Sequence, residues 1–200
     1  ATFELNDSAL RVAETLNTSV GVPFLTPVKG HNVVFTTLWD NFPSVNTIPL
    51  QGKANRIYLM MAGSTNAMQS QIENGVVRVA YTDGSADSLL LINPESWIPI
   101  EQDFYDDGLA FRLKAKRPYR LHLKSGLVSR TLSAELGRDA QDAAHSVDLN
   151  STGIFGNVLE GGAATLYDLP LDGQKELKHL QVEALSNDVV IGLLGVTLQR

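Results

Sequence analysis

Apolar and polar residues alternate one by one over several short stretches of the chain. Val77, Val79 and Tyr81 are separated by Arg78 and Ala80. The same alternation occurs over residues 109–113, 119–123 and 180–184. In a β-strand successive side chains point to opposite faces, so this pattern puts one face into a core and the other into water. The four stretches are therefore predicted to be half-buried strands.

Two further runs, residues 57–61 and 189–198, are apolar at nearly every position. A strand covered on both faces has this composition. Their short length, their Val, Ile and Thr content and the glycines Gly192 and Gly195 favour strand over helix. Both runs are predicted to be central strands, and the second is predicted to follow the strand at 180–184 in antiparallel direction after a turn at 186–188.

Turn-forming pairs punctuate these stretches at short intervals. They are Gln51-Gly52, Asn74-Gly75, Asp83-Gly84, Asp107-Gly108, Ser125-Gly126, Asp172-Gly173 and Asn187-Asp188. Many short strands with frequent turns are typical of sandwiches and barrels rather than of alternating strands and helices. The predicted fold class is therefore all-β, a two-sheet antiparallel jelly-roll sandwich with little helix.

Three segments fall outside this pattern. Residues 8–16 fit either a short helix capped by Asp7 or an edge strand through Leu10 and Val12. Residues 65–73 are expected to contain a helical turn between two strands. Residues 129–148 are polar and alanine-rich, without alternation, and are interpreted as a long excursion that includes a helical turn.

The chain has 200 residues, which fits one β-sandwich domain spanning 1–200. Net charge is −6, which argues against a nucleic-acid partner because phosphate binding needs a basic surface. The chain has no cysteine, so disulfides and zinc–thiolate sites are excluded. The longest apolar run is about half of what a membrane-spanning helix needs, so no membrane span is expected. Because the sequence starts at Ala1, it is interpreted as a mature form or as the C-terminal part of a larger protein.

Standard catalytic signatures are absent from the sequence. It contains no glycine-rich phosphate loop, no HExxH zinc helix and no GxSxG nucleophile motif. The four histidines are scattered without metal-ligand spacing. No cofactor is therefore expected, with one possible exception among the acidic residues.

Residues 93–111 contain the most suggestive cluster, in which Trp97 and Tyr105 stand among several carboxylates. Carbohydrate sites combine an aromatic face, which stacks on the C–H face of a sugar ring, with acceptors for its hydroxyls. Trp97 and Tyr105 are candidate stacking platforms and Asp106 is a candidate acceptor. The alternative is a surface loop pinned by its aromatic residues. The acids Asp103, Asp106 and Asp107 could instead hold Ca²⁺, although their spacing does not match an EF-hand.

A second aromatic and polar cluster lies at residues 37–43. Trp39 is a candidate platform there, with Asp40 as the hydroxyl acceptor. Such a tryptophan can equally close one end of a sandwich while the neighbouring polar side chains satisfy turn backbone groups. The sequence leaves both interpretations open.

Glycoside hydrolysis would need two carboxyl groups about 5–10 Å apart, one of them with a raised pKa. The available acids do not single out a pair. They are Asp83, Glu101, Asp103, Asp106 and Asp107.

Six segments together resemble a family of large secreted bacterial proteins that are regarded as glycoside hydrolases and occur with polysaccharide-degradation systems. The segments are residues 37–43, 48–66, 77–85, 93–105, 161–172 and 187–200. The similar part of that family is a C-terminal β-sandwich of unknown function, comparable to galactose-binding-like jelly rolls. The resemblance extends from about residue 30 to the C-terminus, and it implies an upstream catalytic domain in the same polypeptide and a periplasmic or extracellular location. It identifies no catalytic residue.

Three functions are compatible with these observations. The first is an accessory module of a glycan-degrading protein that binds carbohydrate or supports the catalytic domain. The second is a structural or interaction module that packs on another domain through an exposed apolar patch. The third is a glycoside hydrolase with a carboxylate pair of its own.

Overall fold

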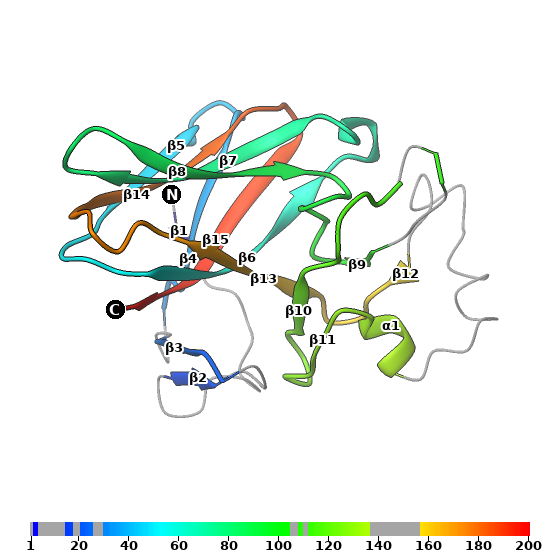
Figure 1. Cartoon of the computed structure of the whole chain (residues 1–200). Coiled ribbons are helices and arrows are strands. Elements are labelled where there is room, and N and C mark those ends of the chain that lie inside the picture. Colours follow the sequence, from blue (N-terminus) through cyan, green and yellow to red (C-terminus); the bar gives the residue numbers. More distant parts are fainter. Residues whose placement is uncertain are drawn as a thin grey trace.

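The computed structural model describes residues 2–3, 15–17, 21–25, 30–104, 108–109, 112–136 and 157–200. Strands make up 52% and helices 3% of this part of the chain, which confirms the all-β prediction. Two antiparallel sheets pack face to face (Figure 1). Within the described part of the chain, no helix is long and apolar enough to cross a membrane.

The larger sheet has seven strands and the smaller has four. In spatial order the larger contains β1 (Thr2–Phe3), β4 (Val33–Thr37), β15 (Val189–Gln199), β6 (Arg56–Thr65), β13 (Ala163–Pro170), β10 (Tyr119–His122) and β11 (Val128–Ser129). The smaller contains β5 (Val45–Pro49), β14 (Leu177–Ala184), β7 (Glu73–Tyr81) and β8 (Ala86–Ile92). Two short pairs stand apart: β2 (Thr15–Asn17) with β3 (Pro23–Leu25), and β9 (Gln102–Asp103) with β12 (Asn157–Val158).

The strand pairs are nested along the chain. β4 pairs with β15, β5 with β14, β6 with β13, and β7 with β8, always antiparallel. Successive strands from β4 to β7 therefore alternate between the two sheets, as in a long hairpin rolled into a sandwich. This is the jelly-roll connectivity that the sequence predicts.

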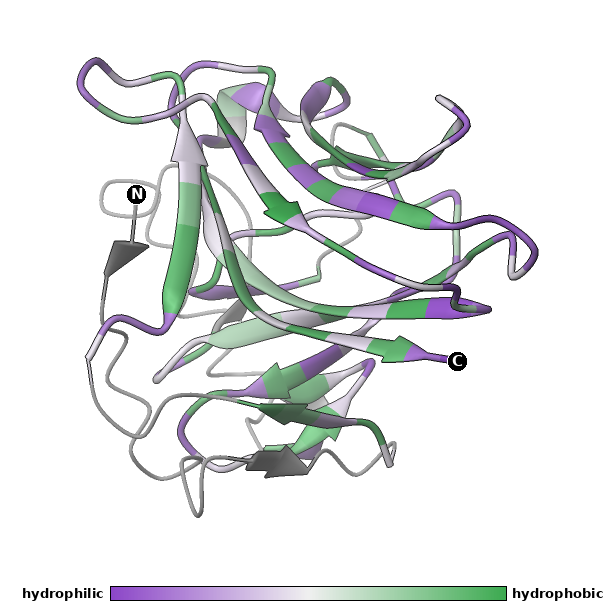
Figure 2. Cartoon of the chain, turned by 90° about the vertical axis from the view of Figure 1, so that its left-hand side faces the viewer, coloured by the Kyte–Doolittle hydropathy of each residue, from purple (hydrophilic) through white to green (hydrophobic). Residues whose placement is uncertain are grey.

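The main core lies between the two sheets. Each central strand contributes every second side chain to it: Ile57, Leu59, Met61 from β6; Val77, Val79, Tyr81 from β7; Leu180, Val182, Ala184 from β14; Val189, Ile191, Leu193 from β15. Figure 2 shows the corresponding alternation of hydrophobic and hydrophilic residues along the strands. The alternation at 77–81 and 180–184 and the two apolar runs thus form the strands that they predict.

A second apolar cluster covers the opposite face of the larger sheet. Its buried members include Met60 of β6, Leu194 of β15 and Phe24 of β3. Phe24 packs against the backbone of β15 at Gly195, where an added Cβ would come within 2.9 Å of its ring. β15 is therefore covered on both faces, which explains why its sequence is apolar on both. Figure 1 places β2 and β3 on the side of this sheet away from the smaller one.

Two expectations about local structure are wrong. Asn74-Gly75 is not a turn but lies inside β7, where the pairing register shifts next to Gly75. The buried Asn74 carboxamide accepts a hydrogen bond from the Thr65 hydroxyl (3.1 Å) and donates to the Gln69 carbonyl (2.8 Å), so a sequence typical of turns is satisfied within a strand. A side chain at Gly75 would collide with Ile191.

The strand expected over residues 109–113 is also not formed in the described part of that segment. Leu109 is exposed and residues 112–114 belong to no strand. Alternation alone does not supply a neighbouring strand to hydrogen-bond with. The stretch at 119–123, by contrast, forms β10 beside β13.

The helical turns occur where they are expected, although each is short. A 3₁₀ turn spans Ala67–Gln69, and α1 spans Leu132–Glu135. Most of the segment 8–16 and residues 137–148 lie outside the described part of the chain. The turn at 186–188 links β14 to β15, but these strands belong to different sheets, so the connection crosses the sandwich instead of closing a hairpin.

Ser96 occupies the free edge of the smaller sheet. The edge strand β8 has β7 on one side only. The Ser96 hydroxyl donates to the Leu90 carbonyl (2.7 Å) and accepts from the Ile92 amide (2.9 Å), while the Ser96 amide donates to the Ile92 carbonyl (2.9 Å). Backbone groups that an extended peptide would otherwise pair with are thus already occupied at this end of β8.

Arg120 is a buried cation that ties an irregular segment to the larger sheet. Its guanidinium donates to the carbonyls of Pro99 (3.1 Å), Ala163 (2.8 Å) and Gln102. Burial lowers the pKa of Arg120 to about 10. The side chain stays charged at neutral pH and holds residues 99–104 against β10 and β13.

Replacing a leucine on the inner face of the smaller sheet should be far more costly than replacing one on its outer face. Leu180 is 0% exposed and Leu90 is 41% exposed. We expect Leu180→Ala to lower the free energy of unfolding by about 2–5 kcal/mol, because it leaves a cavity in the main core. Leu90→Ala should cost about 1 kcal/mol or less. Urea denaturation followed by circular dichroism measures both, and equal losses would contradict the assigned core.

Candidate functional site

The structure separates the aromatic residues proposed for sugar stacking. Trp97 is 0% exposed and lies in the main core, where its ring packs against the backbone at Gly63. A buried face cannot stack on a sugar, so the expectation of Trp97 as a platform is wrong. Tyr105 and Asp106 lie outside the described residues, and no geometry bears on them.

Trp39 remains exposed, as the stacking interpretation requires. It is 51% exposed on the β4–β5 loop, next to the exposed Asp40. The loop is closed by hydrogen bonds from the Thr37 amide to the Pro43 carbonyl (3.2 Å) and from the Phe42 amide to the Trp39 carbonyl (3.3 Å). Trp39 therefore lies on a hydrogen-bonded turn beside Asp40, whereas Trp97 lies in the core.

The proposed Ca²⁺ ligand Asp103 is occupied by protein donors. One carboxylate oxygen accepts from the Phe104 amide (2.8 Å), and the other accepts from the Ser133 amide (2.8 Å) and hydroxyl (2.6 Å). Asp106 and Asp107 lie outside the described residues. Within the described part of the chain, no group of three or more histidine or acidic side chains could hold a metal ion.

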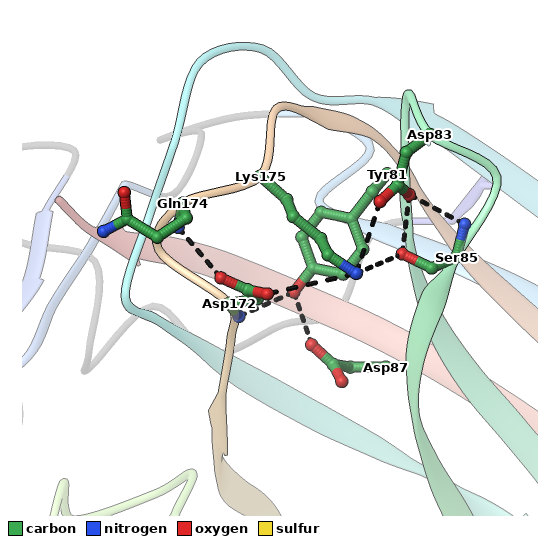
Figure 3. A network of polar contacts seen from close by, with 7 residues as sticks. All are labelled: Tyr81, Asp83, Ser85, Asp87, Asp172, Gln174 and Lys175. Carbon is green, nitrogen blue, oxygen red and sulfur yellow. Dashed lines mark hydrogen bonds and ion pairs between the residues drawn. The ribbon is translucent and has the colours of Figure 1, made fainter.

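A polar network joins the two sheets at the end where the β7–β8 and β13–β14 turns lie (Figure 3). The Tyr81 hydroxyl donates to the Asp87 carboxylate and accepts from the Asp172 amide (2.9 Å). Lys175 lies 3.3 Å from an Asp83 oxygen and donates to the Ser85 hydroxyl (2.8 Å). Each charged group already has a partner within the network, so we interpret it as a clamp between two turns rather than as a reactive site.

Asp83 does not have the property expected of a general acid. Its carboxylate accepts hydrogen bonds from the Ser85 hydroxyl (2.6 Å) and amide (2.8 Å). These bonds, with a smaller contribution from Lys175, lower the pKa of Asp83. Catalytic acids of glycosidases require the opposite shift. The sequence candidate Asp83 is thus excluded as the acid of a catalytic pair.

A pocket with both aromatic and polar walls lies on the outer face of the larger sheet. It has a volume of about 220 Å³ and is lined by Val22, Tyr58, Tyr119, Leu166, Tyr167 and Asp168. Tyr58 is directly opposite Asp168 on the neighbouring strand, and Tyr119 is directly opposite Leu166. Because Leu166 and Asp168 are two positions apart on β13, all four side chains share one face of the sheet. We call this the outer pocket.

Neighbouring groups hold the walls of the outer pocket in place. Asp168 forms an ion pair with Arg56, which raises the pKa of Arg56 through the hydrogen bond to this carboxylate. The Tyr58 hydroxyl donates to the Gln199 side chain (3.2 Å). The Arg130 guanidinium lies 4.1 Å from the centre of the Tyr119 ring. Two tyrosines, a carboxylate and two guanidinium groups thus meet at one rigid surface.

Sequence reasoning missed the outer pocket because its residues come from three strands that are distant in the sequence. Alternation does place Tyr58 on the face opposite Ile57 and Leu59, and that was the available signal. Tyr58 did not stand out as a site residue, because a tyrosine within the apolar run 57–61 is also compatible with a core position. Pairing of β6, β13 and β10 is needed to bring Tyr58, Asp168 and Tyr119 together.

The Tyr81 hydroxyl should make unfolding depend on alkaline pH. Burial, with the hydrogen bond to Asp87, raises the pKa of Tyr81 from 10.0 to about 12. A raised folded-state pKa stabilises the fold fully below pH 10, and this contribution is lost as pH rises from 10 to 12. We expect wild type to lose about 2 kcal/mol more than Tyr81→Phe over this range. Denaturant titrations at each pH measure the difference, and parallel curves for the two proteins would disprove the role of Tyr81.

No protein-family model, no curated protein sequence and no solved structure matches the chain.

Proposed function

We propose that this chain is a non-catalytic accessory domain of a secreted bacterial glycan-degrading protein and that it binds carbohydrate through the outer pocket. The single observation that carries the proposal is the pairing of Tyr58 with Asp168 and of Tyr119 with Leu166 on adjacent strands. Aromatic faces beside a fixed carboxylate and fixed guanidinium groups suit a sugar, which has an apolar C–H face and an edge of hydroxyls.

The position of the pocket on strands supports this function. Side chains on paired strands are held more precisely than those on loops, and a binding site gains from walls that are already ordered. The ion pair of Asp168 and the contact of Arg130 with Tyr119 provide that order here. The resemblance to secreted glycan-degrading proteins agrees with the same role, with a location outside the cytoplasm and with a catalytic domain upstream as the partner.

A second function, docking on another domain, is favoured by a separate observation. Five exposed large apolar residues lie on the β4–β5 and β6–β7 connections: Leu38, Trp39, Phe42, Met68 and Ile72. Val190 is paired with both Thr37 and Ser64, so β4 and β6 finish at the same end of the sheet and their loops lie together (Figure 1). An exposed apolar patch at this end of the sheet, to which Trp39 belongs, is what a module that packs on another domain requires. Intrinsic glycoside hydrolysis remains an alternative for which the described residues offer no supporting pair of carboxylates.

Removing either tyrosine of the outer pocket should weaken carbohydrate binding. We expect Tyr58→Ala and Tyr119→Ala each to raise the Kd for an oligosaccharide about tenfold, because an aromatic contact contributes on the order of 1.5 kcal/mol. Tyr58→Phe, which keeps the ring, should bind almost as wild type does. Isothermal titration calorimetry with a panel of plant, algal and host oligosaccharides measures these affinities, and circular dichroism checks that each variant folds.

The variant Trp39→Ala separates the two surfaces. It should leave carbohydrate binding unchanged if the outer pocket is the site. Loss of binding in Trp39→Ala together with normal binding in both tyrosine variants would move the site to the β4–β5 loop. Absence of binding by wild type across the panel at millimolar concentrations would rule out the carbohydrate function.

A further inference from the structure

The charge of the chain is distributed very unevenly. Residues 112–130 contain seven of the sixteen lysines and arginines and no aspartate or glutamate. The remaining nine basic residues share the rest of the chain with all 22 acidic residues. A net charge of −6 therefore conceals one strongly basic segment, which runs through β10 and β11 beside the outer pocket.

Within the part of the chain that the structure describes, several cations of this segment have no acidic partner. Lys114 pairs with Glu95 (2.9 Å) and Lys124 with Glu160 (2.7 Å), while Arg120 is buried against backbone carbonyls. The other four basic residues form no ion pair with any residue that the structure describes: Arg112, Lys116, Arg117 and Arg130. Cations without an opposite charge leave a positive potential that favours anionic ligands.

One of these cations lies against a residue that lines the outer pocket, and the backbone of a second lies next to the first. Arg130 stacks over the Tyr119 ring at 4.1 Å and donates from Nη1 to the Arg117 carbonyl (2.8 Å). Arg130 is thus fixed next to a pocket tyrosine, and the same hydrogen bond keeps residue 117 close. A planar guanidinium is suited to paired hydrogen bonds with a carboxylate or a sulfate.

We propose that the ligand of the outer pocket is an acidic glycan, one whose sugar rings carry carboxylate or sulfate groups. A ring of the glycan lies against Tyr58 and Tyr119, while Arg130 and the adjoining Arg117 bind the acidic groups of the same chain. This inference rests on the proposed carbohydrate function and specifies its ligand.

A glycan fits the pocket better than a nucleic acid does, although both are polyanions. Asp168 projects from the pocket face, where its carboxylate accepts hydrogen bonds from sugar hydroxyls but repels closely spaced phosphates. The acidic remainder of the chain also opposes an extended phosphate backbone. An acidic sugar presents a charge on one edge of a ring and hydroxyls on the others, which matches Asp168 in the pocket lining and Arg130 beside Tyr119.

Matched ligands test the acidic-glycan proposal. The full chain is titrated with oligosaccharides of galacturonate, mannuronate and glucuronoxylan, with their carboxyl-reduced forms, with a sulfated galactan and its desulfated form, and with a single-stranded oligonucleotide. We expect at least one acidic glycan to bind about tenfold more tightly than its neutral counterpart. Its affinity should fall as salt increases from 50 to 300 mM, because salt screens the attraction. Comparison of each glycan with its carboxyl-reduced or desulfated form identifies which acidic group is bound.

Charge-removing variants locate the effect. Arg130→Gln and Arg117→Gln should each weaken binding of the acidic glycan about threefold or more and leave binding of the neutral form nearly unchanged. Arg117→Gln leaves the contact between Arg130 and Tyr119 in place. Weaker binding by this variant therefore cannot be explained by a shift of the Tyr119 ring. Arg78→Gln is the matched control, since Arg78 pairs with Glu183 on the other sheet, and it should bind as wild type does.

The outcomes distinguish this inference from the function on which it rests. Equal or tighter binding of every neutral form would overturn the acidic specificity while leaving carbohydrate binding in place. Tighter binding of the oligonucleotide than of every glycan would also overturn it and assign the surface to nucleic acid. Absence of binding to all glycans would reject the proposed function itself.

Discussion

The burial of β15 on both faces is the constraint on which the rest of the structure depends. β15 pairs with β4 on one side and with β6 on the other, so it lies inside the larger sheet and not at an edge. Its inward side chains, such as Ile191, complete the main core, and its outward Leu194 completes the second apolar cluster. Both layers of the molecule therefore assemble on one strand, and β6, which carries Tyr58, takes its position from that strand.

Placement on strands distinguishes the outer pocket from the loop sites that first attract attention in this sequence. Trp39 and its neighbours stand on a turn, whereas Tyr58, Tyr119 and Asp168 stand on three strands of one hydrogen-bonded sheet. A strand fixes the direction of each side chain through its pairing partners. The basic segment joins the same sheet at β10 and β11, where Arg130 lies over the ring of the pocket residue Tyr119.

The sequence predicts the fold well because the fold depends on side-chain periodicity. The alternating stretches 77–81 and 180–184 predict half-buried strands. The run 189–198, which is apolar on both faces, predicts a central strand. Periodicity fails in the described part of 109–113, which belongs to no strand. The turn prediction fails at Asn74, whose side chain finds hydrogen-bond partners inside a strand. The candidate site is less predictable, since a buried Trp97 and an exposed one have the same sequence signature, and Tyr58 meets Tyr119 only through pairing with β13.

The way Ser96 occupies the end of β8 has a consequence for how copies of this domain behave at high concentration, where their sheet edges come close together. Bare strand edges under such crowding join into continuous sheets and finally into fibres. With the Leu90 carbonyl and the Ile92 amide already hydrogen-bonded, neighbouring molecules can lie side by side at this end of β8 without pairing into a shared sheet.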